Sequence, residues 1–161
     1  MSKEKSNALE SLTKYIPGFG GYAKKEKRRE DDRLTREFLA RRLQECKVSL
    51  EKKTLPLVEQ GNLDAVAKSE KLRHKIELQQ NRLRAAVEGY ASWFDERQVD
   101  EALLKEIADM DENLIGVVDR LQQAVAPKDP AADIDWNLAE EMVTLLSDRF
   151  SRRQSTLQDR E

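Results

Sequence analysis

Histidine and cysteine each occur only once in this chain of 161 residues, as His74 and Cys46. A di-iron site in a helical bundle needs two Glu-x-x-His pairs, and the residue three before His74 is Lys71. A lone cysteine cannot form a disulfide within the chain, so nothing indicates an oxidising compartment. The single histidine excludes a di-iron enzyme. Cys46 falls on an apolar helical seam, so we expect it to be a buried and inert thiol.

The sequence also lacks the patterns that phosphate chemistry requires. Glu106, Asp109 and Glu112 follow one another at intervals of three, but the Glu-x-x-Glu partner that helical nucleotide pyrophosphatases use to bind magnesium is missing. The glycines of 18–21 follow no strand and precede no Lys-Ser/Thr pair, so they do not form a phosphate-binding loop. We read these carboxylates as a charged helix face, and we expect no enzymatic activity, no metal and no cofactor.

Aromatic residues and long apolar runs are scarce as well. Aromatic residues make up 6% of the chain, hydrophobic residues 39% and charged residues 37%. The longest uncharged stretch near the N-terminus, 15–23, contains a proline and three glycines, whereas a spanning helix needs about 20 apolar residues. The opening MSKEKSNALE has no apolar core of the signal-peptide type. We therefore expect a cytoplasmic protein, with association at the inner face of a membrane as the open alternative.

Leucine, alanine and charged residues are abundant instead, and apolar positions recur in steps of four and three, the spacing of a coiled-coil seam. Two such seams mirror each other about Gly61, which sets Leu50 beside Leu72 and Cys46 beside Ile76. The all-α fold expected here therefore contains a long antiparallel hairpin of two helices, about 23–58 and 62–94. The first seam is Leu39, Leu43, Cys46, Leu50, Lys53 and Leu57. The second is Ala65, Ser69, Leu72, Ile76, Gln79, Leu83, Ala86, Tyr90 and Trp93.

Two further helices, about 100–125 and 135–150, complete an elongated four-helix bundle. Their inward positions are Leu103, Ile107, Met110, Leu114, Val117, Leu121 and Ala124, with Leu104, Val118 and Val125 beside them, and then Ala139, Val143, Leu146 and Phe150, flanked by Met142 and Leu145. Residues 23–150 thus form the bundle, and the polar tail 151–161 is expected to fray.

Local signals place the ends of these helices. Asn62 and Asp135 are good N-caps for the second and fourth helices, and Asp100 is a candidate for the third. Pro56 is expected to kink or end the first helix, and the prolines at 127 and 130 to end the third. We expect Tyr90, Trp93 and Phe94 to fill one end of the bundle.

Charge is distributed unevenly along the chain, although the net charge is only −2. Residues 1–90 hold 21 Lys/Arg and 14 Asp/Glu, whereas residues 91–161 hold 8 and 17. Halves of opposite sign can attract each other within one chain or between copies, so a homo-oligomer is among the expectations. The basic stretch 24–42 is diluted by five acidic residues and contains one aromatic residue, Phe38, and we expect no nucleic-acid binding.

Residues 1–22 form an amphipathic arm followed by a Pro/Gly connector. The arm is expected either to fold back and cover the bundle core or to insert into a membrane surface or a partner's groove. The candidate partner or membrane contacts are Leu9, Leu12, Ile16, Phe19, Tyr22, Lys24, Lys25, Arg28 and Arg29.

The run IPGFGGYAKKEKRREDDRLTREFLARRL, residues 16–43, resembles the opening of a family of uncharacterised bacterial helical proteins. That family begins with an Ile-Pro-Gly-aromatic-x-Gly-Tyr turn followed by a charged helix, and the resemblance implies no particular activity. The order of amphipathic start, basic hairpin and acidic C-terminal part is similar to that of membrane-remodelling proteins of the phage-shock and ESCRT type. This second resemblance concerns layout and not motifs.

Two functional hypotheses follow. The first is a non-enzymatic adaptor or scaffold that presents a charged helical face to a protein partner of unknown identity, with self-association as a further feature. The alternative is a peripheral membrane protein that docks or assembles on anionic lipid through residues 8–29.

Overall fold

The computed structural model describes residues 2–86 and 101–158 of the chain. Over those ranges the chain consists of helices and loops without any strand, and the predicted all-α fold class is confirmed. The helices are α1 (Ser2–Tyr15), α2 (Arg28–Glu59), α3 (Leu63–Ala85), α5 (Glu101–Val125) and α6 (Trp136–Gln158), with a single 3-10 turn, η1 (Lys25–Lys27), before α2.

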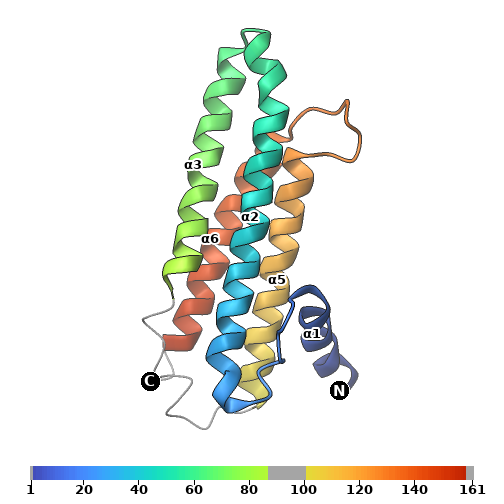
Figure 1. Ribbon diagram of the computed structural model, residues 1–161, viewed down its shortest axis with the longest axis vertical. Coiled ribbons are helices and arrows are strands. Elements are labelled where there is room, and N and C mark those ends of the chain that lie inside the picture. The colour runs from blue at the N-terminus through green and yellow to red at the C-terminus, as the bar shows by residue number, and fades with distance from the viewer. Residues whose placement is uncertain (1, 87–100, 159–161) are drawn as a thin grey trace.

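Four long helices run along the same axis (Figure 1). Helix α2 packs against α3 and α5, and α6 packs against α5 and α3, while the short α1 packs against α5. The end of the α2–α3 pair extends past the neighbouring ends of α5 and α6, as the upper part of Figure 1 shows. This arrangement leaves one end of α2 and α3 without helical neighbours.

A tight turn at 60–62 joins α2 to α3 for reasons visible in the sequence. Gly61 has φ 72°, a left-handed conformation that favours glycine. The Asn62 side chain accepts a hydrogen bond of 3.1 Å from the backbone N–H of Ala65, so the predicted N-cap is confirmed. Helix α2 does not end at Pro56, because this residue lies in the last turn and removes only one hydrogen bond near the helix end.

Side-chain contacts join α2 to α3 at several points along the pair. The hydroxyls of Thr54 and Ser69 lie 2.8 Å apart, and the amide nitrogen of Gln80 donates to the carbonyl of Ala40 at 3.1 Å. The Arg36 guanidinium reaches the carbonyl oxygen of Leu83, near the opposite end of the pair, at 2.8 Å. The residues that make these contacts are all buried.

Most of the predicted inward positions are buried. The exceptions are half-buried side chains near the helix ends or at the edges of the apolar stripes: Lys53, Leu57, Ala86, Leu104, Met110 and Leu145. Tyr90, Trp93 and Phe94, which were expected to fill an end of the bundle, and the candidate cap Asp100 lie outside the described residues.

Helix boundaries differ from the sequence-based expectations at two places. Helix α2 begins at Arg28 and not near 23, because the preceding backbone is held in a loop by Asp31. Helix α6 does not end near 150 but continues to Gln158, and Arg153 and Leu157 are each only 1% exposed. The end of α6, expected to fray, is therefore part of the packed structure. Asp135 caps α6 as predicted, its carboxylate accepting from the N–H of Leu138 at 3.1 Å.

The contact between Thr54 and Ser69 allows a direct test of the pairing. In a Cys46→Ala background, Thr54→Cys with Ser69→Cys should form a disulfide under mild oxidation, because the two side chains already touch. A mobility shift on non-reducing gels measures the bond. The matched control is Thr54→Cys with Glu70→Cys, one residue further along, which should crosslink much less. Preferential crosslinking of that control would show that the register is wrong.

Candidate functional site

The N-terminal arm folds back on the bundle. Leu12, Ile16, Phe19 and Tyr22, four of the predicted contact residues, are between 0% and 4% exposed, and Leu9 is half-buried against the same core. They are covered by the chain itself, as the folded-back alternative expected. They could reach a membrane or a partner only after the arm has left the bundle.

The basic residues predicted beside the arm lie mainly at the surface. Lys24, Lys25 and Arg29 are exposed. Arg28 is half-buried, and its Nε donates a hydrogen bond of 2.9 Å to the carbonyl of Tyr22. The structure thus separates the predicted set into an apolar group inside and a largely exposed cationic group outside.

One carboxylate, that of Asp31, fixes the connector between α1 and α2. Its two oxygens accept hydrogen bonds from the backbone N–H of Gly20 at 2.8 Å and of Tyr22 at 2.9 Å. A Cβ at Gly20 would lie 3.3 Å from that carboxylate, so a larger residue there would require the carboxylate to shift by a few tenths of an ångström. Tyr22 has a φ of 57°, rare for a non-glycine residue, and its ring packs edge-on against Phe19 at 5.1 Å.

A network of charged side chains lies under this connector, in the core. Arg153 of α6 contacts Asp111 of α5 and Asp32 of α2, each at 2.6 Å. The Nε of Arg36 donates to the other oxygen of Asp32 at 2.9 Å, and the Tyr22 hydroxyl donates to Asp111 at 2.7 Å. We call these five residues the buried charge network. It joins the connector to three long helices.

Burial and pairing shift the acidity of this network. Burial, together with the negative charge of Asp111, raises the pKa of Tyr22 well above its ordinary value. Burial also raises the pKa of Asp111, against the opposing attraction of Arg153. For Asp32, burial favours the neutral form, but the charges of Arg153 and Arg36 outweigh it and the pKa is lowered. The ionisation of Asp32 therefore stabilises the fold above its unfolded pKa, and this contribution is lost as pH falls through the folded pKa.

The buried charge network holds several segments together and is almost closed to solvent. The side chains of Arg153, Asp111, Arg36 and Asp32 are 1%, 0%, 3% and 11% exposed. None of its buried nitrogen or oxygen atoms lacks a hydrogen-bond partner. Removal of one charge would leave its partners buried and uncompensated.

Cys46 and His74 show no arrangement for catalysis. Burial raises the pKa of the Cys46 thiol to about 12, so the nucleophilic thiolate is scarcely populated near neutral pH. His74 is exposed, and Glu70, its neighbour four residues earlier, pairs with Arg73 at 3.1 Å. Within residues 2–86 and 101–158, no group of three or more His, Cys, Asp and Glu side chains is placed to hold a metal ion.

The carboxylates considered for magnesium binding face cations. Glu106 and Asp109 line an open hollow of about 430 Å³, together with Lys105 of α5 and Arg149 and Arg152 of α6. Bound magnesium would instead need further oxygen ligands on the opposite wall. The observed surroundings are those of a charged surface.

Opposite charges of the two halves pair in part within this one chain. Arg42 of α2 contacts Asp119 of α5 at 2.7 Å, and Lys75 of α3 contacts Glu140 of α6 at 2.5 Å. Both pairs are partly exposed, so each contributes about 0–1 kcal/mol. The charge asymmetry thus helps to orient the helices with respect to one another.

Large apolar side chains are exposed at the end of the α2–α3 pair. Leu55, Val58 and Leu63 are 56%, 51% and 80% exposed, and they lie on either side of the turn at 60–62. We call these three residues the end patch. Sequence reasoning did not single it out, because these positions lie off the seams. The signal that could have found it is the presence of leucine and valine where the outer face of a helix is otherwise charged.

Comparison of the chain with known protein families, with curated proteins and with solved structures gives no match. Among the described helices, none is long and apolar enough to cross a membrane. The function therefore has to be inferred from the buried charge network, the end patch and the charged surface.

The buried charge network predicts unequal effects for two adjacent arginines. Arg153→Ala should lower the free energy of unfolding by about 3–5 kcal/mol, because Asp111 and Asp32 would lose their shared counter-charge inside the protein. Arg152→Ala, at an exposed position on the same helix, should change it by less than about 0.5 kcal/mol. Urea unfolding at pH 7 measures both values. Similar losses in the two variants would contradict the role assigned to Arg153.

Proposed function

We propose that the chain is a non-enzymatic helical adaptor, an elongated four-helix bundle whose antiparallel hairpin, α2–α3, presents its overhanging end to a protein partner. The observation that supports this proposal is the exposure of Leu55, Val58 and Leu63 at that end. The end patch lies beyond the ends of α5 and α6, where a partner can approach it without displacing either helix (Figure 1).

Single exposed apolar side chains are common on proteins, but their concentration at one end of a helix pair is informative. Burying one leucine or valine side chain completely is worth about 1.5–3 kcal/mol. A partner that covered the end patch would gain a part of this for each of three side chains, because they are 51–80% exposed.

The charges around the end patch suit the polar rim of such an interface. Asp64 and Lys68 pair with each other at 3.2 Å along α3, and Lys52 and Glu59 are exposed on α2. Both signs are present, so this end has no strong preference for a charged partner. Recognition there depends on apolar contact, with the mixed charges surrounding it.

Substitution of the end patch tests the proposal. The triple variant Leu55→Glu, Val58→Glu and Leu63→Glu should keep its helical content, because glutamate is a good helix former at exposed positions. A protein that co-purifies with the wild type is identified, purified and titrated by calorimetry. Its affinity should fall at least tenfold for the triple variant.

Leu78→Glu is the matched control, since Leu78 is 57% exposed on α3 but far from the turn. It should bind the purified partner as the wild type does. Unchanged affinity of the triple variant, or an equal loss in the control, would rule out the end patch as the binding surface. Analytical ultracentrifugation of the same variants shows whether the partner is a second copy of this chain.

Membrane docking through residues 8–29 is the second candidate, favoured by the exposed Lys24 and Lys25 beside the arm. It requires the arm to leave the bundle, which would expose Leu12 and Tyr22 and open the buried charge network. We therefore expect the wild type not to float with vesicles of anionic lipid. Flotation that is abolished by Lys24→Glu with Lys25→Glu would favour membrane docking over the adaptor.

A further inference from the structure

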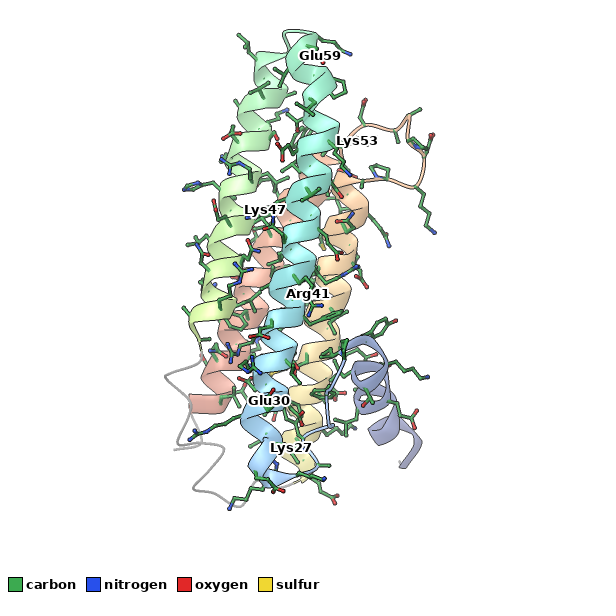
Figure 2. All side chains as sticks on the ribbon, in the orientation of Figure 1. Lys27, Glu30, Arg41, Lys47, Lys53 and Glu59 are labelled. Carbon is green, nitrogen blue, oxygen red and sulfur yellow. The ribbon has the colours of Figure 1, made fainter. Side chains whose placement is uncertain are left out.

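A hollow of about 550 Å³ lies on the face formed by α2 and α3. Four arginines, one glutamate and one glutamine line it: Arg33, Arg36, Glu37, Arg41, Gln44 and Arg84. We call this site the arginine hollow. It lies away from the end patch, and Figure 2 shows Arg41 about halfway along α2.

Two of the four arginines are already neutralised by carboxylates of α2. Arg33 pairs with Glu30 at 2.6 Å and with Glu37 at 2.9 Å. Arg36 is buried and pairs with Asp32 at 2.9 Å, as part of the buried charge network. These pairs fix the walls of the hollow and leave its charge to the remaining two arginines.

Arg41 and Arg84 carry that remaining charge. Both are exposed, and neither forms a salt bridge with any residue of the described ranges. They come from different helices, Arg41 from α2 and Arg84 from α3, and both line the hollow. The side-chain oxygen of Gln44 accepts a hydrogen bond from Gln80 at 3.2 Å, so its NH₂ group remains as a donor. The hollow thus offers donors and positive charge but few acceptors.

The two remaining arginines select the chemistry of the ligand. Arg41 and Arg84 line the hollow from different helices, so a ligand that carries several carboxylates can contact both. Planar guanidinium groups bind carboxylates through paired hydrogen bonds.

We propose that the arginine hollow binds an acidic segment of a protein, whose carboxylates contact Arg41 and Arg84. The proposal deepens the adaptor function and rests on it for the class of ligand, a protein, but it does not depend on the end patch. Contact with Arg41 and Arg84 supplies the attraction, and the paired Arg33 and Arg36 keep the walls in place.

The experiment uses the full chain and a synthetic eight-residue peptide containing four glutamates, titrated by fluorescence anisotropy at low salt. The wild type should bind this peptide and should not bind the same peptide with glutamine in place of glutamate. Arg41→Gln with Arg84→Gln should weaken binding at least tenfold, since both unpaired charges are removed. The control Lys52→Gln with Lys71→Gln removes two exposed charges elsewhere on α2 and α3 and should stay within about twofold.

Three results would overturn the proposal: no binding of the glutamate peptide, an equal loss in the lysine control, or tighter binding of inorganic tripolyphosphate than of the peptide. The third result would identify a site for free polyphosphate. The triple variant of the end patch separates this proposal from the previous one. It should bind the peptide like the wild type, whether or not it still binds the partner protein.

Discussion

Arg153 lies inside the protein between two carboxylates, and the arrangement of the described chain depends on that position. Moving a guanidinium out of water costs several kcal/mol unless charges and hydrogen bonds compensate for it. Asp111 and Asp32 do so at 2.6 Å each, and they belong to two different helices. Tyr22 adds the connector by donating to Asp111. The guanidinium group of Arg153 therefore holds α2, α5, α6 and the connector together.

The N-terminal arm packs back on the bundle, and this determines which surfaces remain for interaction with partners. Ile16, Phe19 and Tyr22 are buried in the core, whereas Leu55, Val58 and Leu63 are exposed at the end of the α2–α3 pair. Arg41 and Arg84 of the same pair, which form no salt bridge within the described ranges, lie between the two ends. In the adaptor that we propose, the arm packs against α5, and the opposite end of the α2–α3 pair and one face of that pair would contact partners.

Features set by short-range chemistry were predictable from the sequence. Gly61, Asn62 and Asp135 have the conformation or hydrogen bonds that their residue types favour. The buried charge network was missed because charge was taken as a sign of exposure, although its helical members continue the apolar rows. Arg153 follows Phe150 at the next seam step, and Asp32, Arg36 and Asp111 likewise occupy inward positions. Sequence spacing places such residues inward, but only the three-dimensional contacts show that their charges meet.

Hydrogen exchange at the Tyr22 amide tests the central claim that the arm and the bundle form one cooperative structure. This N–H donates to Asp31 at 2.9 Å and lies beside the buried charge network. The account predicts that it exchanges only through the same opening as the amide of Leu43 in the core of α2, with a similar free energy. Exchange near the unprotected rate at Tyr22, while Leu43 remains protected, would contradict the account, because the arm would then separate from an intact bundle.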